Sequence, residues 1–171
     1  MRVIRSWKNI KPKIHPTAFI SEAAYVLGEV EIGSNSSIWP GVVIRGDSGK
    51  IKIGNNTNIQ DGSIVHSDAP AVIGDNVTVG HGVVCHARTI GNDCLIGNNA
   101  TVNDGAEIGE YSIVAANSVV LEGTQIPPNS LVVGTPATVK GQVKEKHINL
   151  IKETAVHYIG RCKEYKELEL E

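Results

Sequence analysis

The chain has few aromatic residues and few cysteines. Its 171 residues include one phenylalanine, two tryptophans, four tyrosines and three cysteines. Large aromatic side chains supply much of the buried area of ordinary cores, so their scarcity indicates a thin core of smaller aliphatic residues. Cys85, Cys94 and Cys162 show no paired spacing. A disulfide framework is therefore not expected, and the predicted location is the reducing cytoplasm.

The sequence also has no strong excess of charge and no long apolar run. The formal net charge is -2 and no basic run occurs, which excludes the usual electrostatic footprint of a nucleic-acid partner. No apolar stretch could span a membrane, and residues 1–5 lack the apolar core of a signal peptide. With 41% hydrophobic and 20% charged residues, the composition favours a single domain over residues 1–171.

The chain does contain a six-residue repeat of aliphatic side chains. The repeat shifts by three residues after Ile44, by two after Val65 and by one, in the other direction, after Cys85. A period of six fits neither an α-helix nor a hairpin meander, but it fits a coil in which three hexads complete one turn. The members are Ile20, Val26, Ile32, Ile38, Ile44, Ile53, Ile59, Val65, Ile73, Val79, Cys85, Ile90, Ile96, Val102, Ile108, Val114, Val120, Ile126, Val132 and Thr138.

This repeat predicts a mainly β protein built as a parallel β-helix over about residues 15–141. The pattern resembles the left-handed parallel β-helix of hexapeptide repeats, and the hand is implied by that resemblance alone. Residues before about Phe19 are expected to be irregular, with Trp7 and Ile10 covering the first coil. Residues 134–137 are expected to end the coils.

The period changes near residue 142. Apolar residues then follow a spacing of three and four, with Glu and Lys between them, which predicts one amphipathic α-helix over about residues 142–169. Its apolar positions are Ile148, Ile151, Ala155, Tyr158, Ile159, Cys162 and Tyr165.

The phase of the repeat predicts where three histidines lie. The hexads that start at Ile44, Val65 and Cys85 are three hexads apart and so share one face. Arg45, His66 and His86 directly follow these starts, and we expect them to form a ladder with rungs about 4.8 Å apart. His66 and His86 could therefore bind one metal ion.

The third histidine lies on a second face. Asp61 and His81 each stand two places after the hexad starts at Ile59 and Val79, so Asp61 lies under His81, with Gln60 beside it. Because this face turns away from the first, His81 can join the other histidines only from another subunit. A homotrimer in which the first face meets the second face of a neighbour would complete the site and set Arg45 opposite Asp61.

Simpler interpretations of these residues stay open. Arg45 and Asp61 could serve only as interface residues, and Asp47 could be a turn residue. His66, His81 and His86 could also be incidental surface residues. We interpret the remaining histidines, His15, His147 and His157, in this way.

Three segments together resemble the γ-class carbonic anhydrase family: RGD at 45–47, NIQDGSIVH at 58–66 and GHGVVCH at 80–86. The resemblance implies a Zn²⁺ site, or one for Fe²⁺ or Co²⁺, with His66 and His86 from one subunit and His81 from the next. It implies that a metal-bound hydroxide converts carbon dioxide to bicarbonate. Its implied supporting residues are Gln60, which orients that hydroxide, Arg45, Asp47 and Asp61, which hold the site in place, and Tyr158, which the helix directs at it.

The chain departs from this family in its acidic residues. Founding members carry a glutamate after the Arg-Gly-Asp segment and another after the first histidine, for proton transfer. Here Ser48 takes the first place, and only Asp68 offers a carboxylate near the second, so slow hydration is expected. The alternatives are a hexapeptide-repeat acyltransferase or thioesterase-like enzyme, because residues 133–137 resemble acyltransferase coil ends, or a metal-binding trimer with little hydration activity.

Overall fold

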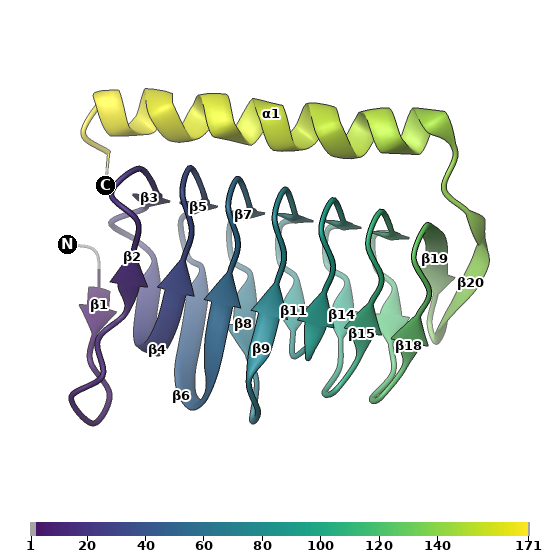
Figure 1. Cartoon of the computed structure of the whole chain (residues 1–171), viewed down its shortest axis with the longest axis horizontal. Helices are drawn as coiled ribbons and strands as arrows, with labels where there is room; N and C mark the ends of the chain where they lie inside the picture. The colour runs from purple at the N-terminus through teal and green to yellow at the C-terminus, as the bar shows by residue number, and fades with distance from the viewer. Residues whose placement is uncertain (1–2, 171) are drawn as a thin grey trace.

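The computed structural model describes residues 3–170 as a parallel β-solenoid with one long helix beside it (Figure 1). Met1, Arg2 and Glu171, which belong to the predicted domain, lie outside the described residues. The coils advance along the long axis, and three columns of short strands form three flat faces. The predicted fold class, a β-solenoid of hexapeptide repeats with a C-terminal helix, is confirmed.

The strands fall into the three faces as follows. The first face contains β1 (Val3–Arg5), the first half of β4 (Tyr25–Ile32), the first half of β6 (Val43–Ile53), β8 (Ile64–His66), β11 (Val84–Cys85), β14 (Thr101–Val102) and β17 (Val119–Val120). The second contains β3 (Phe19–Ile20), β5 (Ser37–Ile38), β7 (Asn58–Ile59), β10 (Thr78–Val79), β13 (Leu95–Ile96), β16 (Ile113–Val114), β19 (Ser130–Gly134) and β20 (Ala137–Gln142). The third contains β2 (Lys13–Ile14), the second halves of β4 and β6, β9 (Ala71–Ile73), β12 (Thr89–Ile90), β15 (Glu107–Ile108) and β18 (Gln125–Ile126).

The core is the stack of repeat residues. Ile44 faces Val65 in the β6–β8 register, and Val65 faces Cys85 in the β8–β11 register. Every repeat residue from Ile20 to Val132 is buried, with at most 6% of its surface exposed. Branched side chains suit this arrangement because they stack on the pleated surface of the coil below. The hexad frame therefore placed the inward positions correctly over this range.

The C-terminal end of the repeat was predicted wrongly by one hexad. Thr138 is exposed and faces Val133 across an antiparallel pair of β19 and β20. The chain reverses direction at residues 135–136, so the parallel coils end with Val132 and β20 returns along the strand that precedes it. The six-residue spacing between Val132 and Thr138 therefore arises from a short hairpin and does not continue the repeat.

The N-terminal segment is more regular than expected. β1 and β2 both pair in parallel with β4 and so cover the edge of the first coil. Trp7 and Ile10 face each other in a tight hairpin and are 41% and 47% exposed, and Trp7 Cβ lies beside Gly28 of β4. The edge of the first coil is therefore protected mainly by the backbone pairing of β1 and β2.

The helix α1 (Glu145–Glu167) lies along the second face (Figure 1), slightly shorter than the predicted range 142–169 because β20 continues to Gln142. Ile151, Ala155 and Cys162 are its buried residues. Tyr158 and Tyr165 pack edge-on against Trp39, with ring centroids 5.4 and 4.9 Å apart. α1 therefore lies on the second face, where the predicted trimer had placed a neighbouring subunit.

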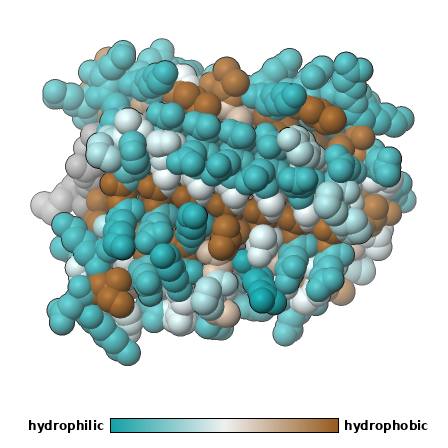
Figure 2. All heavy atoms as spheres, viewed as in Figure 1, coloured by the Kyte–Doolittle hydropathy of each residue, from teal (hydrophilic) through white to brown (hydrophobic). Residues whose placement is uncertain are grey.

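The third face is turned toward the viewer in Figure 1. Polar side chains cover most of this side of the molecule, and apolar atoms show mainly as a band along the coils (Figure 2). Between residues 3 and 170, no helix has both the length and the apolar character needed to cross a lipid bilayer.

Candidate metal centre

The predicted ladder of Arg45, His66 and His86 is present at the corner that follows the first face. Arg45 faces His66 in the β6–β8 register, and the rings of His66 and His86 lie 5.1 Å apart at an interplanar angle of 74°. β8 and β11 pair directly, which brings residues 20 apart in the sequence into adjacent coils. The two imidazoles are thus close enough to approach a common ligand.

His66 has no hydrogen-bond partner for either ring nitrogen among the described residues, although its side chain is only 6% exposed. Its Nε2 lies 3.2 Å from Asp47 Oδ1, but this contact does not have the direction of a hydrogen bond. Leaving a buried polar group unpaired costs on the order of 1–3 kcal/mol. An ion at this corner would give the imidazole the partner that the chain does not.

Asp47 is held by Arg45 of the same chain. Arg45 Nη1 donates to Asp47 Oδ1 and Oδ2 at 2.9 and 2.7 Å. These hydrogen bonds from Arg45 lower the pKa of Asp47 below its usual value, against the opposing effect of burial. Asp47 lies inside β6, so the alternative interpretation as a turn residue is wrong.

His86 is anchored by a residue that the sequence reasoning missed. Its Nδ1 lies 3.1 Å from Asp104 Oδ1, which reaches back from the corner one coil further on. Asp104 stands two places after the hexad start at Val102. Extending the ladder by one more coil gives Asn103, so the phase argument that aligned the histidines does not point to Asp104.

His81 lies at a different corner, between the second and first faces. β7 and β10 pair with Ile59 opposite Val79, so Asp61 lies under His81 as predicted. Asp61 Oδ2 is 3.1 Å from His81 Nδ1, and both side chains are about half exposed. His81 and His86 therefore each have a carboxylate on Nδ1, which leaves Nε2 as the nitrogen on the opposite side of the ring.

Gln60 and Tyr158 lie beside His81. Gln60 is buried and its Nε2 donates to Asn58 Oδ1 at 2.9 Å. Together with His81 and Thr154 of α1, both residues line a small pocket. Burial raises the pKa of Tyr158, and the nearby Asp61 carboxylate raises it further. The helix thus brings Tyr158 to this corner, a point that the sequence left open.

Within one chain, the described histidines do not form a complete metal site. Among residues 3–170 of one chain, no group of three or more His, Cys, Asp or Glu side chains is arranged to hold an ion. One corner supplies the pair His66 and His86, and another supplies His81. Neutral imidazoles suit Zn²⁺ and also Fe²⁺ or Co²⁺, and zinc accepts three protein ligands with one open position.

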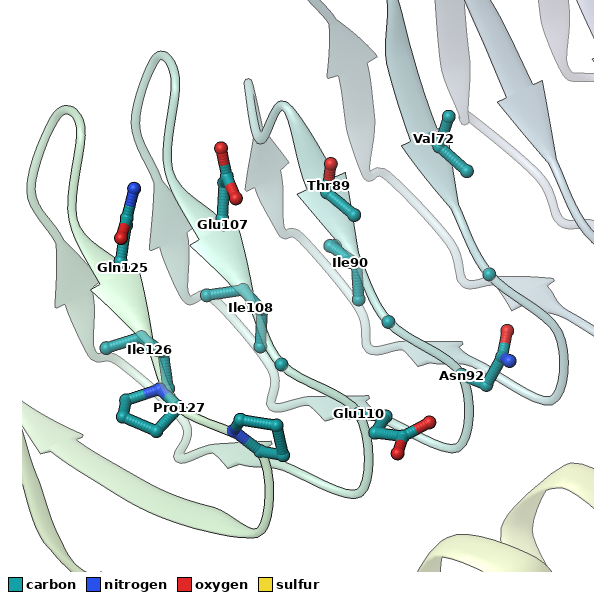
Figure 3. A pocket seen from close by; sticks show the side chains of 14 residues that line it. Val72, Thr89, Ile90, Asn92, Glu107, Ile108, Glu110, Gln125, Ile126 and Pro127 are labelled. Carbon is teal, nitrogen blue, oxygen red and sulfur yellow. The ribbon is translucent and has the colours of Figure 1, made fainter.

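A separate hollow lies on the third face. Val72, Thr89, Glu107 and Gln125 form one outward row from successive strands (Figure 3). This hollow contains none of the predicted site residues and no histidine. The candidate centre is therefore not in this hollow but at the two corners that flank the first face.

The repeat, the three faces and the flanking helix define a hexapeptide-repeat β-solenoid protein. A family model described as "Bacterial transferase hexapeptide (six repeats)" matches residues 11–46 and 89–122. A Methanocaldococcus jannaschii protein named "Probable carbonic anhydrase" is 47% identical over 82% of this chain and 89% of its own length. The Escherichia coli carnitine operon protein CaiE is 37% identical over 92% of this chain and 83% of its own length.

A solved structure agrees over almost the whole chain. The hexapeptide transferase family protein from Anaplasma phagocytophilum superposes with a TM-score of 0.92 at 37% identity, over 96% of this chain and 98% of the other. With the spacing of the three histidines, these relatives settle the family. The chain belongs to the γ-class carbonic anhydrase family of hexapeptide-repeat proteins.

Proposed function

We propose that the protein is a metal-dependent carbonic anhydrase that interconverts carbon dioxide and bicarbonate as a homotrimer. His66 and His86 of one subunit and His81 of the next would hold Zn²⁺, with Fe²⁺ or Co²⁺ as other candidates. The observation that carries the proposal is His66, which is buried beside His86 with no hydrogen bond at either ring nitrogen. A bound Zn²⁺ would lower the pKa of a coordinated water toward about 7 and so supply a nucleophile at neutral pH.

The neighbouring side chains have matching parts in this proposal. Gln60 donates its amide N–H to Asn58, so its carbonyl oxygen stays available to accept a hydrogen bond from a reacting water. Asp47, kept ionised by Arg45, faces His66 and fixes the negative side of the site. Asp61 holds His81, and Tyr158 borders the pocket where the substrate would lie.

The outer surface of the first face supports the homotrimer. Tyr25, Val43, Ile64 and Val84 are aligned from strand to strand and point outward, and Ile64 and Val84 are 40% and 37% exposed. The second face is covered by α1, and the third is mostly polar. A continuous apolar stripe on a sheet face is suited to burial against another subunit. This stripe lies between the corner of His66 and the corner of His81, where a shared site requires the contact.

Mixing two inactive variants tests the shared site. His66→Ala and His81→Ala should each abolish carbon dioxide hydration in stopped-flow assays, because each removes one side of every interface. Mixed trimers, formed by unfolding and refolding the two variants together, would contain interfaces with both native sides and should recover part of the activity. Absence of recovery in mixed trimers of confirmed mass would contradict the proposal. So would the absence of activity in the native chain after loading with Zn²⁺, Co²⁺ and anaerobic Fe²⁺ in turn.

An acyltransferase or thioesterase-like activity is the second candidate. It is favoured by the transferase description of the family model and by the likeness to a hexapeptide transferase family protein. Against it, no connection between consecutive strands from β3 to β20 is longer than four residues, so one chain offers no extended loop for a coenzyme A arm. Turnover of acetyl-CoA by a protein that does not hydrate carbon dioxide would favour this candidate.

A metal-binding trimer with little hydration activity is the third candidate. Ser48 offers no carboxylate, and Asp68 is 78% exposed and 3.9 Å from His66 Nε2, a poor position for rapid proton export. In this case His81→Ala would dissociate the trimer, and the native protein would already be inactive.

We also place the protein in the cytoplasm, because Cys85, Cys94 and Cys162 are all free and buried.

A further inference from the structure

Asp104 contacts His86 and stands outside the set of residues that the family resemblance assigns to the site. We propose that Asp104 is the positioning residue of His86: its carboxylate fixes the imidazole in the Nδ1–H form and directs Nε2 at the metal. This inference rests on the proposed metal site, and it assigns a specific part to a residue one coil away from the ligand.

The chemistry of the contact determines which nitrogen is free. A carboxylate can only accept hydrogen bonds, so the 3.1 Å contact between Asp104 Oδ1 and His86 Nδ1 requires Nδ1 to carry the proton. In a neutral imidazole Nε2 then has the lone pair that a metal needs. Histidine ligands in metal sites usually donate their other ring N–H in this manner, which fixes both the tautomer and the ring orientation.

A comparison of the three histidines shows why two of them need a carboxylate. His66 is only 6% exposed, so packing restricts its ring. His86 and His81 are 28% and 50% exposed, so packing restricts their rings less than it restricts that of His66. These two are the histidines with a carboxylate on Nδ1, at 3.1 Å in both cases, although Asp104 and Asp61 come from different corners. Of these two contacts, the one between Asp104 and His86 has the geometry of a hydrogen bond, whereas the one between Asp61 and His81 is an ion-pair distance only. Asp104 is therefore the carboxylate that can orient its histidine as burial orients His66.

The contact should affect metal binding more than folding. The Asp104 side chain is 55% exposed, so its hydrogen bond to His86 is in competition with water and adds little stability to the chain. The role of this hydrogen bond is to set the tautomer and the ring orientation of His86 before the metal binds. Removing such a supporting contact typically weakens metal binding by about 10- to 100-fold.

The test compares Asp104→Ala and Asp104→Asn with Glu122→Gln. Glu122 is a matched control because it is an exposed carboxylate at the same place one coil further on, two coils from His86. Zn²⁺ affinity would be measured by competition with a chromophoric chelator at fixed pH, and the trimer mass and far-UV circular dichroism would be checked first. We expect binding about 10- to 100-fold weaker in Asp104→Ala. Asp104→Asn, which keeps an acceptor oxygen, should lose less Zn²⁺ affinity than Asp104→Ala. The Zn²⁺ affinity of Glu122→Gln should stay within about twofold of that of the native protein.

A second measurement separates a positioning role from a structural one. In the metal-free native protein, ¹⁵N spectra of the imidazoles should show His86 as the Nδ1–H form, and Asp104→Ala should shift it toward the mixture typical of free histidine. Native affinity in Asp104→Ala, or an unchanged His86 tautomer, would overturn the inference. If His86→Ala also binds Zn²⁺ like the native protein, the metal site itself is wrong; if His86→Ala loses binding while Asp104→Ala does not, only the part assigned to Asp104 fails.

Discussion

Two corners of the same solenoid carry stacked polar side chains, and the two stacks differ in how their hydrogen bonds are satisfied. At the corner between the third and second faces, the side-chain amide of Asn35 donates to Asn56, that of Asn56 to Asn76 and that of Asn76 to Asp93. The Nδ2–Oδ1 distances are 3.1–3.2 Å. At the corner after the first face, His66 lies between Arg45 and His86, and neither of its ring nitrogens has a hydrogen bond within the described residues.

The difference separates a structural stack from a candidate functional one. The asparagines adopt φ values of 54–56°, a conformation that this residue type tolerates well, and their amides satisfy one another along the solenoid. That stack needs nothing from outside the chain. The histidine corner leaves both ring nitrogens of the buried His66 without a hydrogen bond, and buried polar groups are rarely left in that state. This contrast is the reason why the proposed metal is placed at the histidine corner.

The largest expected effect is the stabilisation of the fold by Zn²⁺, which should depend on the histidine corner and not on the asparagine corner. In the native protein, Zn²⁺ at 100 times its Kd should stabilise the folded state by about 2.7 kcal/mol. His66→Ala should lose that increment and the hydration activity together, while the metal-free variant unfolds at nearly the native temperature, because an unsatisfied group has been removed. Calorimetric unfolding with and without Zn²⁺ measures both quantities. A His66→Ala protein that Zn²⁺ stabilises as before would remove the distinction between the corners.

The asparagine corner should resist any added volume. A Cβ on Gly54 would lie 2.5 Å from the carbonyl oxygen of Gly74 and would also clash with the side chain of Asp75. Gly54→Ala should therefore destabilise the fold by about 3 kcal/mol. Gly160→Ala, at a helix position with no atom within 4 Å of the new Cβ, is the control and should stabilise by about 0.5–1 kcal/mol. Urea unfolding of both variants checks this, and an unaffected Gly54→Ala would show that the corner can relax.

The core next to the histidine corner should respond to alkaline pH. Burial raises the pKa of Cys85 from 9.0 to about 11. Because the folded-state pKa is raised, the unfolded chain releases this proton first, and stability should fall by roughly 2 kcal/mol as the pH rises from 9 to 11. Cys85→Val introduces the residue type of Val65 and Val102, which stack on either side of Cys85. The variant should not show the loss of stability that is due to ionisation of Cys85.

Urea unfolding of Cys85→Val and the native protein at pH 8 and pH 11 measures the difference. Cys94, with a pKa raised by burial to about 12, is present in both proteins and cancels in the comparison. The variant should bind Zn²⁺ normally, because Cys85 points into the core while His86, the next residue, points out. Weakened metal binding in Cys85→Val would mean that core and site are not independent.

The smallest expected effect is at the middle of the asparagine stack. Asn56→Gly keeps a residue that accepts φ of 56° and removes only the two side-chain hydrogen bonds, to Asn35 and Asn76. The expected loss of stability is about 1 kcal/mol, with metal affinity and activity unchanged. Thermal unfolding and the chelator assay test the two parts. A change in metal affinity would show that the corners are coupled through the coils.

Much of the candidate site follows from counting along the repeat. Because the side chains of a solenoid recur with a fixed period, the alignment of Arg45 with His66 and the stacking of Asp61 under His81 could be read from position alone. The frame failed where the chain leaves the coil, as at Thr138 in the terminal hairpin and at the strands before Phe19. Asp104 was missed because it serves a histidine one coil back, and its own hexad carries no other unusual residue.

The sequence by itself determined the inward positions, the order of residues along each corner and the separation of His81 from the other two histidines, because a period of six admits one phase. Only the tertiary structure decided that α1 covers the second face and brings Tyr158 to His81, that Arg45 pairs with Asp47, and that His66 has no hydrogen bond within the described residues. These depend on side-chain directions and on the packing of distant segments, which a repeat of backbone positions does not specify.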